Sequence, residues 1–113
     1  IIHFAASILV DESVSKPLSY YKNNLLSLIH ILELSAKYEI NNFVFSSSCS
    51  VYGEPDSLPV NEQAPIKKAE SPYANTKQIG EEIIADSVKV SSLKAISLRY
   101  FNPVGGHESG LIG

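Results

Sequence analysis

The chain has 113 residues, of which 44% are hydrophobic and 19% charged, a balance typical of one small globular domain rather than of a disordered segment. Its net charge is −3 and its 9 Lys and Arg residues are scattered, so we expect neither nucleic acid nor a membrane surface as a partner. Cys49 is the single cysteine, which excludes an internal disulfide and favours a reducing, cytoplasmic location. No apolar run approaches the ~20 residues of a membrane-spanning helix.

Both ends of the sequence fall inside predicted structure. The chain begins at Ile1 within an apolar strand pattern, without an initiator Met, and it stops at Gly113 in a loop that contains Gly105 and Gly106. No basic region followed by an apolar region opens the chain, so we expect no secretory signal. We therefore expect residues 1–113 to be an internal fragment of a longer protein.

The first third of the chain predicts a strand and then a helix. The apolar run from Ile1 to Ala5 is typical of a strand buried on both faces. A polar connection is expected at residues 11–13, after which Pro17 suits the first turn of a helix, with Ser15 or a neighbour as its cap. The helical spacing of apolar residues then predicts a helix over Leu18–Tyr38.

Two more strands and one more helix follow. Residues 43–45 predict a second strand, and the proline-rich segment from Gly53 to Pro72 predicts a long loop. A helix is expected over Tyr73–Val90 and a third strand over Ala95–Tyr100. This βαβαβ alternation predicts an α/β fold, part of a doubly wound parallel-sheet (Rossmann-like) domain that lacks its first βαβ units.

Three segments should gather at one edge of this sheet. In doubly wound sheets, ligands bind beyond the carboxyl ends of the strands. The segments predicted to lie there are Ala5–Ile8, Ser46–Ser50 and Phe101–Gly106. We expect the functional site to be built from them.

Tyr73 and Lys77 stand four residues apart at the start of the second helix, so their side chains are neighbours on one helical face. A free phenol has a pKa of about 10, too high for a base near neutrality, but a cation one turn away favours the phenolate. The pair is therefore a candidate proton acceptor. Taken alone, the same spacing more often means a solvated tyrosine beside a surface lysine.

Ser46, Ser47 and Ser48 follow the second predicted strand, and this serine run strengthens the interpretation of Tyr73 and Lys77 as a catalytic pair. A serine hydroxyl both donates and accepts, so it can bridge a sugar hydroxyl and a phenolate. The alternative is that these serines satisfy loop backbone groups.

His3 is expected in the core at a strand end and His107 in the final loop, and no Cys, His or Asp spacing suggests a metal, so we expect none.

Several motifs follow one another in a characteristic order. They are His3-Phe4-Ala5-Ala6, Ser46-Ser47-Ser48-x-x-Val51-Tyr52-Gly53, Ser71-Pro72-Tyr73-x-x-x-Lys77 and Leu98-Arg99-Tyr100-Phe101-Asn102-Pro103-Val104-Gly105. Together they resemble the UDP-glucose 4-epimerases of the extended short-chain dehydrogenase/reductase family. The resemblance covers essentially the whole chain, and the triple serine separates it from related sugar-nucleotide dehydratases.

The resemblance implies that the protein binds NAD and a UDP-sugar. Tyr73 would take the proton from the sugar O4, Ser48 would share or relay it, and Lys77 would hold the nicotinamide ribose and favour the phenolate. These three residues are the predicted catalytic set. The residues that would bind the cofactor are Phe4, Ala5, Ala6, Asn23, Ser48, Tyr73, Lys77 and Phe101. Those that would bind the substrate are Ser48, Tyr73 and Asn102, the last through the diphosphate.

The implied reaction is epimerisation of a UDP-hexose at C4 through a transient 4-keto sugar, interconverting UDP-glucose and UDP-galactose in galactose metabolism. The alternatives are a nucleotide-sugar dehydratase or decarboxylase of the same superfamily, and a non-catalytic module that binds NAD or a sugar nucleotide. A binding module has no need of a proton-transfer set, so the presence of Ser48, Tyr73 and Lys77 favours an enzyme.

Two features depart from the family pattern. Ile8 stands where these epimerases usually have a lysine that contacts the cofactor phosphates, and the glycine-rich loop that holds the pyrophosphate has no counterpart in residues 1–113. We interpret residues 1–113 as the C-terminal part of the NAD-binding domain, incomplete at both ends and inactive alone. The sugar-binding C-terminal part has no counterpart either.

We also expect a homodimer built on the two helices, Leu18–Tyr38 and Tyr73–Val90. One side of each helix should pack on the sheet, yet Leu26, Ile31 and Leu34 lie on other sides and need cover. Pairing two helices from each subunit in a four-helix bundle would bury them, and the family resemblance implies the same arrangement.

Overall fold

Three parallel strands form the centre of the fold. The computed structural model describes residues 1–106 and 108–111, so His107 lies outside the described residues. The strands pair side by side in the order β1-β2-β3, and all pairs are parallel. Their bounds are β1 Ile2–His3, β2 Asn42–Ser46 and β3 Lys94–Leu98. The α/β class and the parallel sheet are therefore confirmed.

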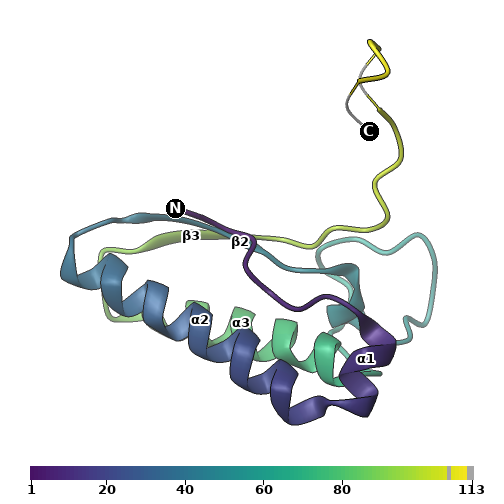
Figure 1. The fold of residues 1–113 in the computed structure, drawn as a ribbon, viewed down its shortest axis with the longest axis horizontal. Helices are drawn as coiled ribbons and strands as arrows, with labels where there is room; N and C mark the ends of the chain where they lie inside the picture. The colour runs from purple at the N-terminus through teal and green to yellow at the C-terminus, as the bar shows by residue number, and fades with distance from the viewer. Residues whose placement is uncertain (107, 112–113) are drawn as a thin grey trace.

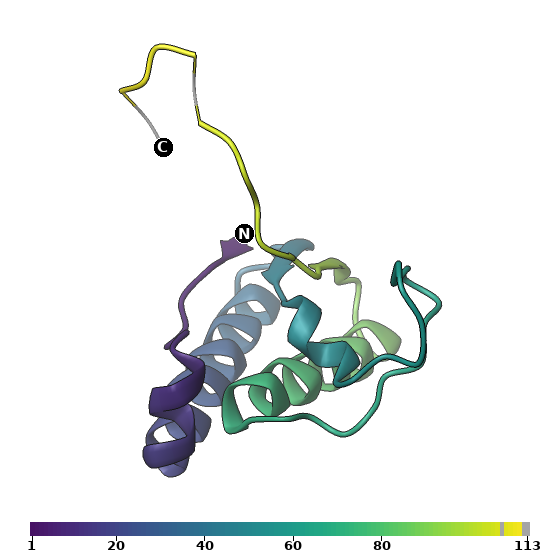
Figure 2. The same cartoon turned by 90° about the vertical axis from the view of Figure 1, so that its right-hand side faces the viewer.

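Two long helices connect the strands and lie side by side on one face of the sheet (Figures 1 and 2). They are α2 (Pro17–Lys37) and α3 (Pro72–Lys89). Each begins with its proline in the first turn, where the missing N–H costs no hydrogen bond. The N-cap of α3 is Ser71, whose side chain accepts from the Ala74 amide at 3.1 Å. The predicted helices are confirmed within a residue at each end.

The core lies between this face and the two helices. Phe43 and Phe45 of β2 point toward the helices and are 2% and 3% exposed. They pack with Leu28, Leu32 and Ile84. The alternation of side chains along β2 follows from the pleat of a strand, which sends every second residue to the same face.

Gly80 lets α3 approach the sheet closely. A Cβ atom built there would lie 2.8 Å from Cζ of Phe45, a separation that real Cβ atoms do not tolerate. The close approach brings the first turns of α3 against the end of β2, where the predicted site lies.

The opposite face of the sheet is open. Ile2 is 64% exposed and Ile96 is 61% exposed, and among the described residues no helix lies over them (Figure 2). The expectation that the first strand is buried on both faces is wrong for the described chain. Only the face toward α2 and α3 is covered.

The first strand is also shorter than predicted, and a helix follows it. The strand ends at His3, and the chain then turns toward α2, where the Ser7 amide donates to the Asn24 side chain at 2.8 Å. The expected polar connection contains α1 (Val10–Ser15), so Ser15 belongs to α1 and does not cap α2. Long-range contacts hold this short helix, because the fully buried Ser13 accepts from the Tyr73 amide at 3.1 Å.

Candidate functional site

Lys77 is the buried cation that joins α3 to the end of β2. Its side chain is on the inner face of the helix, and the residue is only 4% exposed. Nζ donates to the Ser46 carbonyl at 2.7 Å and lies 5.0 Å from the centroid of the Phe45 ring. Burial lowers the pKa of Lys77 from 10.5 to about 8, because the charged form loses its hydration.

Tyr73 lies one turn before Lys77, at the start of α3. Lys77 Nζ is 5.7 Å from the centroid of the Tyr73 ring, so the ammonium faces the aromatic side chain as the spacing predicted. Tyr73 is half-buried, and in the described part of the chain its hydroxyl has no hydrogen-bond partner. The hydroxyl is therefore available to a ligand.

Ser48 lies just beyond β2, at the N-cap of the short 3₁₀ helix η1 (Cys49–Tyr52), which the sequence did not predict. Its Oγ accepts from the Ser50 amide at 3.2 Å and from the Ser50 hydroxyl at 2.9 Å. Within residues 1–106 and 108–111, the Ser48 hydroxyl therefore accepts these two bonds and donates none. The serine run satisfies a backbone group, and it presents the half-buried Ser48 hydroxyl at the carboxyl edge; its proposed role as a bridge to a substrate stays a prediction.

The predicted cofactor segment after β1 lies on the surface. Phe4 is 62% exposed, Ala5 is exposed and Ala6 is half-buried. Asn23 is exposed too, and its Nδ2 donates to Ser7 Oγ at 3.2 Å. Asn23 thus supports this segment from α2. Phe4 is therefore not a core residue of the described chain.

The predicted residues after β3 are also exposed. Phe101 is 54% exposed, with its ring centroid 6.4 Å from that of Tyr52, and Asn102 is exposed. Phe101 and Tyr52 help to line a hollow of about 520 Å³ between the end of β3 and the long loop. Ser48, Tyr73 and Lys77 do not line it.

Two further polar residues lie near Lys77: His3, which is in the core as the sequence predicted, and Glu81, which the sequence analysis missed. His3 stacks on Phe45, with ring centroids 6.2 Å apart, and its pKa is lowered by burial and, secondly, by the charge of Lys77. Glu81 lies one turn beyond Lys77 and pairs with Arg99. The spacing Tyr73, Lys77, Glu81 places all three on one helical face, a signal that could have identified Glu81.

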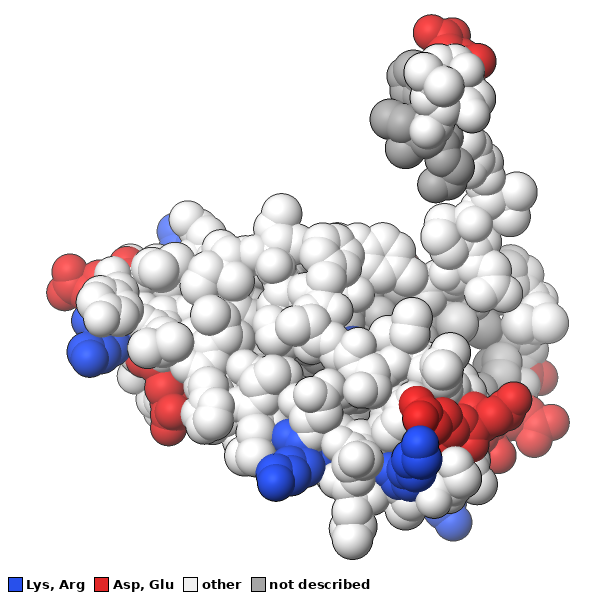
Figure 3. All heavy atoms as spheres, in the orientation of Figure 1, with Lys and Arg blue, Asp and Glu red and all other residues white. Residues whose placement is uncertain are grey.

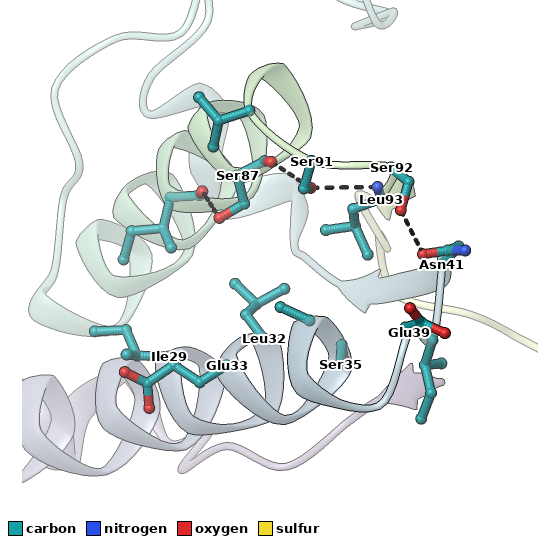
Figure 4. A pocket seen from close by; sticks show the side chains of 14 residues that line it. Ile29, Leu32, Glu33, Ser35, Glu39, Asn41, Ser87, Ser91, Ser92 and Leu93 are labelled. Atoms are coloured by element: carbon teal, nitrogen blue, oxygen red, sulfur yellow. Dashed lines mark hydrogen bonds between the residues drawn. The ribbon is translucent and has the colours of Figure 1, made fainter.

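A second hollow, of about 560 Å³, lies beside the segments that lead into β2 and β3, and Figure 4 shows it from close by. It is lined by the last turns of α2 and α3 and by the segments that lead into β2 and β3. Ser92 Oγ donates to Asn41 Oδ1 at 2.7 Å across its rim. Because it lies at the amino ends of the strands, it is separate from the predicted site.

Within residues 1–106 and 108–111, no group of three or more His, Cys, Asp or Glu side chains is arranged to hold a metal ion. Over the same residues, no helix combines the length and the apolar character needed to cross a bilayer.

The family model and similar known proteins point to the same family. Residues 1–112 match the model of the NAD dependent epimerase/dehydratase family. The chain is 48% identical to a UDP-glucose 4-epimerase of Caenorhabditis elegans and 51% identical to UDP-glucose 4-epimerase 2 of Arabidopsis thaliana. All of the chain aligns in both cases, but it spans only 33% and 32% of those proteins.

The fold matches solved structures of the same kind. UDP-glucose 4-epimerase from Bifidobacterium longum, solved with NAD+ and UDP, superposes on 99% of the chain with a TM-score of 0.92 and 46% identity. The enzyme from Brucella ovis, solved with NAD, gives a TM-score of 0.92 at 40% identity. In each case the chain covers 34% of the solved structure. On this evidence, the chain belongs to the NAD dependent epimerase/dehydratase family.

Proposed function

We propose that the protein containing this chain is an NAD-dependent UDP-sugar 4-epimerase that interconverts UDP-glucose and UDP-galactose. One observation carries the proposal: a buried lysine faces a tyrosine whose hydroxyl has no partner among the described residues, beside a serine-rich strand end. Lys77 Nζ is 5.7 Å from the Tyr73 ring and bonds the Ser46 carbonyl at 2.7 Å. Relatives that carry the name UDP-glucose 4-epimerase, at 48% and 51% identity over the whole chain, support the same reaction.

Tyr73 is the proposed base. As the phenolate, it takes the proton from the sugar O4 while the 4-keto sugar forms, and it returns the proton when the sugar is reduced on its other face. Lys77 favours the phenolate, because its ammonium is held close to the ring in a site of low exposure. Ser48 donates to the sugar oxygen and relays the proton, since its oxygen already accepts from Ser50.

The residues present fit NAD at its nicotinamide ribose. The Lys77 ammonium has three N–H donors, of which the Ser46 carbonyl takes one, so two remain for ribose hydroxyls. Ala5 and Ala6 have small side chains that leave the backbone after β1 accessible, and Asn23 and Phe101 are exposed for further contacts. When bound, NAD supplies the oxidation and reduction at the sugar C4. Asn102 is proposed to hold the substrate diphosphate.

The test is product analysis with the full-length protein. Incubation with UDP-galactose should give UDP-glucose; a dehydrated or decarboxylated product, or no turnover with retained binding, would support one of the alternatives instead. Tyr73→Phe should lower kcat by about 10² to 10⁴-fold while NAD stays bound. Tyr38→Phe, which alters a tyrosine that is 63% exposed at the end of α2, is the matched control. Near-normal turnover by Tyr73→Phe would remove Tyr73 from the mechanism.

We further propose that the full-length protein is a homodimer in which α2 and α3 of each subunit form a four-helix bundle. Leu18, Leu26 and Leu34 follow one another at two-turn intervals along α2 and are 82%, 42% and 46% exposed. Figure 3 shows the molecule with α2 nearest the viewer and the outer face of the two helices along its lower edge; the middle of this view is almost free of charged side chains. Ile31, which was also expected to need cover, packs against the core instead.

Sedimentation of the full-length protein at micromolar concentration tests the dimer. Leu26→Glu should shift the protein toward monomers, because it buries a charge in the proposed bundle. Ser57→Glu introduces the same charge in the exposed long loop and should leave the dimer intact. A monomeric wild-type protein would contradict the proposal.

A further inference from the structure

A bidentate ion pair lies one helical turn beyond Lys77. Arg99, directly after β3, donates from Nη2 to Glu81 Oε2 at 2.7 Å and from Nε to Oε1 at 3.0 Å. The two side chains are 20% and 13% exposed, so the pair is largely shielded from water. Two parallel hydrogen bonds between planar groups fix orientation as well as distance. Glu81 is therefore held rigidly between α3 and the end of β3.

The Glu81–Arg99 pair forms hydrogen bonds to both ends of the segment Ser47–Tyr52. At its start, Ser47 Oγ donates to Glu81 Oε1 at 2.5 Å, and Ser47 is 3% exposed. At its end, Arg99 Nη1 donates to the Tyr52 hydroxyl at 3.1 Å, and the guanidinium lies 4.9 Å from the Tyr52 ring centroid. The bonds from Glu81 and then from Tyr52 raise the pKa of Arg99, which stays a cation.

These two hydrogen bonds restrict where the Ser48 side chain lies. Ser48 follows Ser47 directly and has extended backbone angles, φ −155° and ψ 151°, as the N-cap of η1. Anchoring Ser47 on α3 therefore holds the stretch of backbone that carries the Ser48 hydroxyl. Because Glu81 and Tyr73 belong to the same helical face, the anchor also fixes Ser48 relative to Tyr73.

We propose that Glu81, held by Arg99, is a positioning residue that sets the Ser48 hydroxyl against Tyr73 by binding Ser47. The inference rests on the proposed function of Ser48 and deepens it. Misplacement of a reacting group by about 1 Å can cost about 100-fold in rate. Loss of the anchor should thus lower kcat for the UDP-sugar and change KM little, because Ser47 is 3% exposed and bonds Glu81, whose carboxylate is held by Arg99.

The first test is a double-mutant cycle in the full-length protein with UDP-galactose. Ser47→Ala should lower kcat by roughly 10- to 100-fold with KM changed less than about 3-fold. In a Ser48→Ala background the same Ser47→Ala change should have almost no further effect, because the residue that it positions is gone. Equal losses in the two backgrounds would overturn the proposal, as would an unchanged kcat in Ser47→Ala.

Variants of the pair itself provide a conservative rescue and a control. Glu81→Ala should lower kcat strongly, while Glu81→Gln, which keeps an oxygen that accepts from Ser47, should recover part of the loss. Asp86→Ala removes the carboxylate of an exposed ion pair with Lys89 on the same helix and should leave kcat unchanged. Equal kcat values for Glu81→Gln and Glu81→Ala would contradict a role through Ser47.

Hydrogen exchange tests the positioning independently of any reaction. The Cys49 amide donates to the Tyr100 carbonyl at 2.7 Å and the Val51 amide to the Ser48 carbonyl at 3.2 Å. Glu81→Gln should speed exchange modestly, and Glu81→Ala strongly, at these two amides while the α3 amides stay protected. Unchanged exchange at Cys49 and Val51 would overturn the proposal even if the wild-type protein catalysed a different reaction. If the wild type showed this exchange pattern but did not catalyse epimerisation, only the proposed function would be contradicted, and the positioning of Ser47 by Glu81 would stand.

Discussion

Replacing Lys77 by Met should change how the stability of the NAD-free, full-length protein depends on pH. Lys77 is 4% exposed, and burial lowers its pKa from 10.5 to about 8. Between these two values the unfolded chain binds a proton that the folded protein releases. The wild type therefore gains stability as the pH rises from about 8 to 10.5, and below pH 8 it carries the full cost of a buried charge.

The magnitude follows from the size of the pKa change. Each pKa unit is worth about 1.4 kcal/mol, so the lowering from 10.5 to about 8 corresponds to about 3 kcal/mol. Met fills a similar volume without a charge, but it loses the hydrogen bond to the Ser46 carbonyl. That loss offsets part of the gain at low pH. The difference in unfolding free energy between variant and wild type should thus change by about 3 kcal/mol from pH 7 to pH 10.5, in favour of the variant at pH 7.

Two measurements check this expectation. Urea unfolding followed by circular dichroism at several pH values gives the free-energy difference, and Lys89→Met, which removes an exposed lysine from the same helix, controls for the loss of one charge. An NMR titration of ¹³C-labelled lysine side chains gives the midpoint for Lys77 directly, with the resonance assigned by its absence from Lys77→Met. A midpoint near 10.5, or a free-energy difference that does not vary with pH, would refute the reasoning.

Two further predictions concern the packing around this lysine. Gly80→Ala should destabilise the full-length protein by about 1–3 kcal/mol in urea unfolding, because the new Cβ would meet the Phe45 ring at 2.8 Å; a gain in stability from the better helix propensity of alanine would contradict it. His3→Phe should reduce the loss of stability as the pH falls below 6.5, since burial lowers the pKa of His3 and only the unfolded chain takes up the proton readily. An equal pH 7 to pH 5 difference in wild type and variant would show that His3 is not the cause.

The sequence predicted the regular elements that carry their own signals. The apolar period of α2 and α3 located both helices within a residue at each end, and Pro17 was expected in the first turn of α2; Pro72, which was assigned to the loop, begins α3 in the same way. The short apolar run at residues 43–45 located β2. The spacing of Tyr73 and Lys77 predicted that they share a face, and the structure confirms their proximity. Their roles and those of the other predicted site residues stay predictions.

Elements without such signals were missed. The helix α1 has six residues, too few to show a period, and no side chain caps it. The 3₁₀ helix η1 is shorter still. Both are held by partners that are distant in sequence: Ser13 of α1 bonds the Tyr73 amide, and Arg99 bonds Tyr52 at the end of η1. A local pattern cannot reveal contacts of that kind.

By itself, the sequence determined the order of the elements and the family, because periodicity and motifs are local properties of the chain. Tertiary structure alone decided how those elements meet. In the sequence, Gly80 is only a residue of low helix propensity; in the structure it allows Phe45 to lie against the helix. In the same way, Glu81 is an ordinary helix-surface carboxylate in the sequence, whereas the structure places it between Arg99 and Ser47. The depressed pKa of Lys77 likewise depends on the sheet and helices that exclude water from it. Burial and pairing arise only when residues far apart in the chain are brought together, and they convert an ordinary helix face into a candidate site.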